Sequence, residues 1–214
     1  MKKYILDSKL PEILPIIKVK STILMPQAQL PICMSNSSYL EVSSELVEEN
    51  IVAIVQSQGE GESKTPFKIG CAGQVKEVNF SEDEVTVFIQ GLCRFEIIKK
   101  LPVDKKGLER IKVSYKKYEI DLKKHVLTDP LDKTNLLSAL NLYSRHVNIF
   151  PNWEELEKTP TEVLISALAM ACPLHPNEKQ SLLETVDIHE QSNMITKFIE
   201  MNSFDRFRSS NLIN

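Results

Sequence analysis

The feature that most constrains the fold is a change of hydrophobic period beyond the middle of the chain. Residues 12–119 contain short runs rich in Val, Ile and Phe, which are typical of β-strands. From about residue 131 the apolar residues recur every three to four positions, as on one face of a helix. Strands followed by helices predict an α+β fold. We expect a β-rich part over residues 1–122 and a helical bundle over residues 123–214.

The β-rich part is predicted to hold several short strands. They are expected at 13–19, 30–34, 51–55, 69–80, 85–89, 95–98 and 111–115. Pro15 lacks an amide hydrogen, so the first run is interpreted as an edge strand. Gly70 and Gly73 predict a bulge or a close backbone approach in the fourth run. One helix is expected around Tyr39, Val42 and Leu46, which recur at helical spacing.

The helical part carries clear start signals. Leu136, Leu140, Tyr143 and Val147 form one apolar stripe of a first helix. Thr159-Pro160-Thr161-Glu162 is predicted to be a capping box that opens a buried helix over residues 163–171. Asp187-Ile188-His189-Glu190 is predicted to be a second capping box, and Pro176 to begin the helix before it.

No group of residues predicts catalysis, so we expect a protein that is not an enzyme, with no metal and no cofactor. Cys172 and His175 have metal-ligand spacing, but a zinc site needs three or four ligands and no other Cys is near. The polar run at 56–66 lacks the glycines of a phosphate-binding loop. No Gly-x-Ser-x-Gly motif occurs.

Cysteine usage and the absence of targeting signals favour the cytoplasm. None of the four cysteines forms a Cys-x-x-Cys pair, and all have apolar neighbours, so they are expected to be reduced and buried. Asp7 and Lys9 interrupt the apolar N-terminus, which excludes a signal-peptide core there. No run of 18 apolar residues predicts a transmembrane helix.

The net charge and its distribution bear on whether the chain binds nucleic acid. The chain has 26 Lys and Arg against 29 Asp and Glu, a net charge of −3, whereas a nucleic-acid binder is usually basic. Between Lys99 and Lys124, however, ten basic residues outnumber four acidic ones. Tyr115 and Tyr118 lie within this stretch and could stack on bases. RNA binding by residues 99–124 is therefore kept as the alternative hypothesis.

Several motifs, in order along the chain, resemble the N-terminal substrate-binding domain of the Lon protease family. The family's opening Leu-Pro-Leu-Arg, its Val-Leu-Phe-Pro-Gly turn and the Pro-Leu after it correspond to 14–17, 23–27 and 30–32. Its strand pattern Val-Gly-Thr-x-Ala-x-Ile is echoed at 69–75. The most specific match is Val-x-Gly-x-x-Arg-x-x-Ile, which reads Ile89 to Ile97 here and includes Gly91 and Arg94. The helical part fits through 179–184 and the capping Asp187.

The resemblance implies a PUA-like β pseudo-barrel with one helix, followed by a helical bundle. It also implies a non-catalytic module that binds unfolded or partly folded protein segments, without the ATPase and Ser-Lys peptidase domains of the full-length family members. The chain departs from the family at three positions. Ile17 and Gln191 stand where Arg is usual, and Gln27 stands at the glycine of the turn.

The resemblance and the pattern of flexible apolar side chains suggest where a partner binds. The candidate binding residues are Met25, Pro26, Met34, Met194, Phe198, Met201, Phe204 and Phe207. The members of this set on the last helix are expected to support self-association, because uncovered apolar surface favours a partner. No membrane partner is expected, and nucleic acid is the less favoured one.

Four further residues are given structural roles: Pro15, Gly70, Gly91 and Arg94. Gly91 is expected to adopt a backbone conformation closed to other residues. Arg94 is expected to join a strand to a loop by hydrogen bonds.

Overall fold

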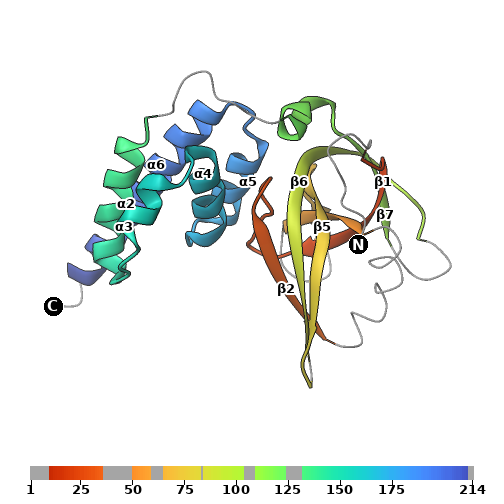
Figure 1. Ribbon diagram of the computed structural model, residues 1–214, viewed down its shortest axis with the longest axis horizontal. Coiled ribbons are helices and arrows are strands. Elements are labelled where there is room, and N and C mark those ends of the chain that lie inside the picture. The colour runs from red at the N-terminus through yellow and green to blue at the C-terminus, as the bar shows by residue number, and fades with distance from the viewer. Residues whose placement is uncertain are drawn as a thin grey trace. The chain divides into compact units, whose positions relative to one another are not determined.

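The computed structural model describes residues 10–35, 50–58, 65–82, 84–103, 109–123 and 132–211, with side chains up to Ser203 in the last range. The chain divides into two compact units, Met1–His125 and Val126–Asn214. Strands make up the first unit and helices the second, which confirms the α+β class (Figure 1). The helix expected around Tyr39, Val42 and Leu46 lies outside the described residues.

The described residues of the first unit form seven strands and one 3₁₀ helix. They are β1 (Ile13–Val19), β2 (Gln29–Ser35), β3 (Ile51–Gln58), β4 (Thr65–Pro66), β5 (Ile69–Phe80), β6 (Glu84–Lys100), β7 (Arg110–Ser114) and η1 (Lys116–Leu122). The sheet order is β1-β7-β6-β5-β3-β4, and a parallel β1–β3 pairing closes it into a barrel. All other pairings are antiparallel, and β2 adds to β6 outside the ring.

The barrel core is filled by residues that alternate along the ring strands. Its cluster contains Leu14, Ile51, Ala53, Val55, Ala72, Phe95, Ile111 and Val113. Strand β3 is buried on both faces, as its continuous apolar run predicts. Register shifts interrupt β5 after Ala72 and after Val75, next to the predicted bulge glycine Gly73.

Two strand predictions need correction. β1 is not an edge strand, because it pairs with β3 on one side and β7 on the other. Pro15 is tolerated because its pairing with β7 ends there and pairing with β3 begins only at Ile16. The runs predicted at 85–89 and 95–98 form one strand, β6, since Gly91 continues the pairing with β5 instead of breaking it.

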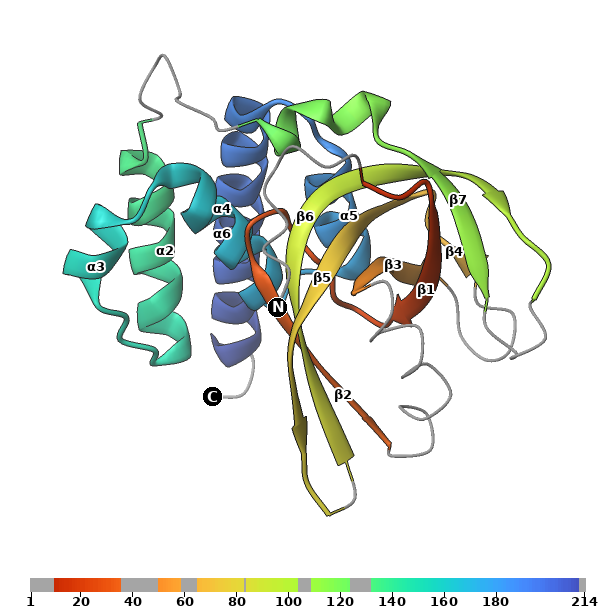
Figure 2. The same ribbon diagram turned by 45° about the vertical axis from the view of Figure 1, so that its right-hand side comes forward.

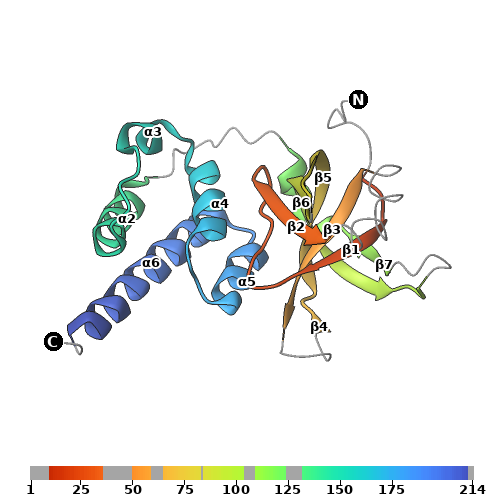
Figure 3. The ribbon, with the colours of Figure 1, turned by 90° about the horizontal axis from the view of Figure 1, so that it is seen from below.

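The part of the second unit that the structure describes forms five α-helices. They are α2 (Thr134–Val147), α3 (Trp153–Lys158), α4 (Thr161–Ala171), α5 (Pro176–Glu184) and α6 (Ile188–Asn211). Helix α6 is the longest and lies beside α2, α4 and α5 (Figure 3). Leu136, Leu140 and Tyr143 of the predicted stripe are buried. The ammonium of Lys133 donates to three carbonyls at the end of α3, those of Leu156, Glu157 and Thr159.

The helix starts follow the predictions in part. Asp187 accepts a hydrogen bond from the amide of Glu190 at 2.8 Å, as a capping residue does. Thr159 does not cap α4, because its hydroxyl donates to the carbonyl of Glu155 in the preceding helix. The helix it was expected to open is not buried all round, since Val163 is exposed. A capping box at His175 and Glu178 begins α5 and had not been predicted.

Gln191, at one of the positions where the chain departs from the family, caps the C-terminal end of α5. Its side-chain amide donates to the carbonyls of Leu182 and Thr185, at 2.8 and 2.9 Å. These carbonyls belong to the end of α5, where the helix leaves them without intrahelical partners. Gln191 is buried, so its amide closes the junction between α5 and α6.

Candidate functional site

A three-stranded ribbon projects from the barrel of the first unit. Strands β5 and β6 form a long hairpin, and β2 pairs with β6 along its outer part (Figures 1 and 2). The hairpin turns at Ser81, whose amide and hydroxyl both donate to the carbonyl of Glu84, at 2.9 and 2.8 Å. This turn fixes the register of β5 and β6 from the tip as far as the shift between Val75 and Glu77.

One face of the ribbon is apolar in every row, because residues opposite one another across strands share a face. The row at the tip contains Phe80, Val85 and Met34, and the next contains Val78, Val87 and Ile32. The valines of β6 are fully buried at the centre, while Met34, Ile32 and Val78 are half-buried. Phe80 is 68% exposed. We call Phe80, Val78, Met34 and Ile32 the ribbon-tip residues.

The predicted binding residues Met25 and Pro26 belong to a turn that contacts Gly91. The amide of Gly91 donates to the carbonyl of Ala28 at 2.8 Å, and its carbonyl accepts from the amide of Gln27 at 3.0 Å. Met25 is only 2% exposed and lies in the core, whereas Pro26 is half-buried. Of the two methionines predicted in this unit, Met34 alone reaches the ribbon tip. Met25 is therefore left out of the surface that we propose below.

The backbone prediction for Gly91 is wrong. Gly91 does not adopt a left-handed conformation; it is required because a Cβ there would lie 2.1 Å from the carbonyl oxygen of Met25. The left-handed residue of this turn is Gln27, with φ of 63°, at the position where the family has glycine. Gly70 is also a close-approach glycine, since its Cβ would lie 2.6 Å from the carbonyl oxygen of Ile54.

Arg94 joins β6 to η1 through a buried ion pair. Its Nε and Nη2 donate to the two carboxylate oxygens of Asp121 at 2.8 and 2.7 Å, and its backbone amide donates to the same carboxylate at 2.9 Å. Both side chains are 5% exposed. The guanidinium also stacks on the ring of Tyr118, 4.7 Å from its centre. Burial alone would lower the pKa of Arg94, but the bonds to Asp121 outweigh it, so that pKa is raised.

The remaining predicted residues lie in the second unit, on α6. Met194, Phe198 and Met201 are spaced as one helical stripe. Met194 and Phe198 are half-buried, and Met201 is 57% exposed. The side chains of Phe204 and Phe207 lie outside those that the structure describes. Among the described side chains of this unit, the most exposed aromatic is Phe150 at 84%, which was not predicted.

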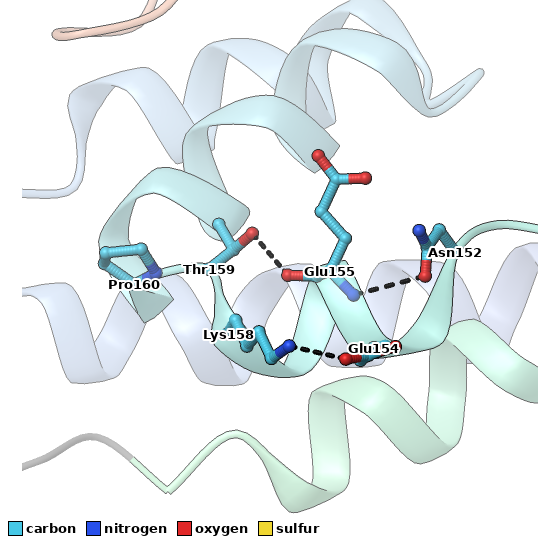
Figure 4. A pocket seen from close by; sticks show the side chains of 6 residues that line it. All are labelled: Asn152, Glu154, Glu155, Lys158, Thr159 and Pro160. Atoms are coloured by element: carbon cyan, nitrogen blue, oxygen red, sulfur yellow. Dashed lines mark hydrogen bonds and ion pairs between the residues drawn. The ribbon is translucent and has the colours of Figure 1, made fainter.

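A surface pocket of about 560 Å³ lies at α3 of the second unit (Figure 4). Its lining residues satisfy one another: Glu154 pairs with Lys158 at 2.5 Å, and Asn152 accepts from the amide of Glu155 at 3.3 Å. Such local helix-end bonds are structural. Among the described residues no group of three or more His, Cys, Asp or Glu is placed to hold a metal ion.

The four cysteines are unpaired, and three of them are buried. The exception is Cys33 on β2, which corrects the expectation that all four lie in the core. Burial raises the pKa of Cys93 to about 12 and that of Cys172 to about 11, and raises that of Cys71 as well. Because the thiolate is the reactive form, burial and the raised pKa both protect these three.

We predict that one thiol in four reacts quickly with a thiol reagent such as Ellman's reagent in the native protein at pH 8. Cys33→Ser should remove this fast phase, and urea should expose the remaining three thiols. A fast phase of two or more thiols in the native protein would contradict the burial described here.

Comparison with known proteins finds matches to Lon proteases. The profile of the family described as "ATP-dependent protease La (LON) substrate-binding domain" matches residues 13–201. The Lon protease of Dictyoglomus thermophilum is 25% identical over 207 residues, and that of Koribacter versatilis is 27% identical over 205. These alignments cover 89% and 90% of this chain but 24% of each relative. The chain thus spans about a quarter of the length of these relatives.

Solved structures show the same fold. The N-terminal domain of the Mycobacterium avium complex Lon protease superposes with a TM-score of 0.63 at 16% identity, covering 87% of this chain and 97% of that one. A Lon N-terminal domain protein from Xanthomonas campestris gives a TM-score of 0.61 at 18% identity, covering 87% and 98%. No helix in the described part of the chain is long and apolar enough to cross a membrane.

Proposed function

Because the chain belongs to the family of Lon (La) protease substrate-binding domains, we propose that it recognises unfolded polypeptide segments through the ribbon-tip residues and carries out no catalysis itself. The observation that carries this proposal is Phe80, a large aromatic side chain that is 68% exposed beside three half-buried apolar neighbours. Exposed apolar clusters of this kind mark binding surfaces. Met34 adds a flexible side chain suited to varied partners.

The proposal includes the absence of ATPase and peptidase activity from residues 1–214. It is supported by the family match, which is to a substrate-binding domain, and by the lack of a phosphate-loop motif in the sequence. We also place the protein in the cytoplasm. Four unpaired cysteines fit a reducing compartment.

The test compares two phenylalanines. We expect Phe80→Ser to weaken binding of a reduced, carboxymethylated model protein about tenfold, since burying an aromatic side chain contributes on the order of 1.5 kcal/mol or more. The matched control is Phe150→Ser, an equally drastic change at an exposed aromatic of the second unit, which should leave the affinity unchanged. Equal affinities for wild type and Phe80→Ser would refute the ribbon tip as the site.

Self-association through α6 is a second part of the proposal. Met201 is 57% exposed on the stripe that it shares with Phe198, so the stripe offers apolar surface to a second copy. Sedimentation velocity over a range of concentrations should show an oligomer for the wild type and a shift toward monomer for Met201→Glu. A wild type that stays monomeric at every concentration would remove this part.

We do not extend the proposal to RNA. The relatives reported above are proteases, and one lysine of the basic stretch, Lys112, lies 3.9 Å from the carboxylate of Glu12. An RNA oligomer therefore serves as a control in the binding measurements.

A further inference from the structure

Strand β2 is an edge strand of the ribbon. Its residues pair with β6 from Gln29 to Ser35, and no other strand among the described residues pairs with it (Figure 2). The side chains of Gln29, Pro31 and Cys33 are exposed along it. An edge strand presents backbone N–H and C=O groups that another chain can use.

The register shows which groups point outward. Ala28 and Gly91 lie opposite each other just before the first β2–β6 pair, and the amide of Gly91 donates to the carbonyl of Ala28. They are therefore a hydrogen-bonded pair. In an antiparallel ladder, hydrogen-bonded and non-bonded pairs alternate. Leu30, Ile32 and Met34 therefore bond to β6. Gln29, Pro31 and Cys33 belong to the other set, whose backbone groups point away from β6.

Pro31 agrees with this assignment. Proline has no amide hydrogen, so within a sheet it is tolerated where its nitrogen faces away from the partner strand. At position 31 the outer edge thus offers a carbonyl acceptor alone. Gln29 and Cys33, on either side, each offer both a donor and an acceptor.

We propose that an extended segment of unfolded polypeptide adds to the outer edge of β2, between Gln29 and Cys33, as a further strand. This inference rests on the proposed function and specifies how the same ribbon binds its substrate. Strand addition recognises backbone groups, which every unfolded chain exposes whatever its sequence, whereas a folded chain has already paired most of them. It therefore explains selectivity for the unfolded state without a sequence motif.

The apolar face of the ribbon adds a preference to this backbone recognition. Side chains of an added strand alternate between the two faces, so every second one continues the rows of Leu30, Ile32 and Met34. The preferred occupant is a segment of about five to seven residues with apolar side chains at alternate positions, because β2 offers five residues between Gln29 and Cys33.

Hydrogen exchange of the full chain, followed by NMR, tests the inference. The probe is a peptide of alternating valine and threonine with lysines at both ends. Its binding should slow exchange of the Gln29 and Cys33 amides about tenfold or more, and leave Leu30 and Ile32, already bonded to β6, unchanged. The same peptide N-methylated at every central residue keeps its side chains but loses its donors, and should not bind.

The outcomes separate the two proposals. Peptide binding without protection of Gln29 and Cys33, or equal binding of the N-methylated peptide, overturns strand addition and leaves the proposed function in place. Failure to bind both the peptide and an unfolded model protein overturns both.

Two substitutions at Cys33 test the outer edge of β2 by changing the protein instead of the peptide. Cys33→Pro removes one outward amide, and should weaken binding of the valine–threonine peptide about fivefold, as expected for one hydrogen bond. Cys33→Val keeps the amide and should bind like the wild type. Full affinity in a folded Cys33→Pro variant would overturn the inference, and the exchange measurement decides the matter should that variant fail to fold.

Discussion

Replacing Arg94 by alanine is expected to lower the free energy of unfolding by about 3–5 kcal/mol, because it leaves the carboxylate of Asp121 buried without its cation. The ion pair is nearly inaccessible to water, with both side chains 5% exposed. The same change removes the stacking on Tyr118, itself a fully buried residue of η1. Urea unfolding followed by circular dichroism measures the loss.

The matched control is an ion pair on the surface of the same unit. Lys18 and Glu109 approach to 2.7 Å, but their side chains are 32% and 49% exposed. Lys18→Ala should therefore change stability by about 0.5 kcal/mol or less. If Arg94→Ala were as mild as this control, the pair would not hold η1 against β6. If it folded normally and lost only partner binding, Arg94 would have a functional role instead.

Replacing Gly91 by alanine is expected to destabilise the protein by about 3 kcal/mol, the upper end for overpacking. The new Cβ would lie 2.1 Å from the carbonyl oxygen of Met25 and 2.9 Å from its carbon. Both atoms are backbone, so no side chain can rotate to make room. The turn that links β1 to β2 must move, and with it the hydrogen bonds between Gly91 and the residues that precede β2.

Lys99→Ala, at an exposed position of the same strand, is the control for this measurement and should change stability by about 0.5 kcal/mol or less. Equal urea midpoints for wild type and Gly91→Ala would mean that the turn can shift without cost. That result would contradict the close approach as the reason for glycine.

The sequence predicted the fold class because the period of its apolar residues differs so clearly between the two parts. The continuous apolar run at 51–55 forms a strand buried on both faces, as such runs do. The closure of the barrel was not predictable in this way. It depends on a parallel pairing between β1 and β3, which are separated by more than thirty residues along the chain. Local patterns contain no information on such a pairing.

The candidate site was harder to predict than the fold. Met25 and Met34 are the same type of residue and have similar neighbours in sequence. Met25 nevertheless lies in the core, whereas Met34 lies at the ribbon tip. The difference comes from the path of the chain: Met25 lies in the turn that bonds to Gly91 and is buried, whereas Met34 lies on β2 opposite Val85 at the tip. Phe80 was missed because a strand-forming residue is normally expected to be buried. Its position directly before the charged turn 81–84 was the one indication that it lies at an exposed end.

The most direct test of the central claim is fluorescence anisotropy of a labelled, chemically unfolded model protein titrated with this chain. The folded form of the same protein and an RNA oligomer serve as controls, at low and at moderate salt. Preferential binding to the unfolded form, little changed by salt, is the predicted result, because apolar and backbone contacts carry it. Equal affinity for folded and unfolded protein, or binding to RNA alone that falls steeply with salt, would contradict the account.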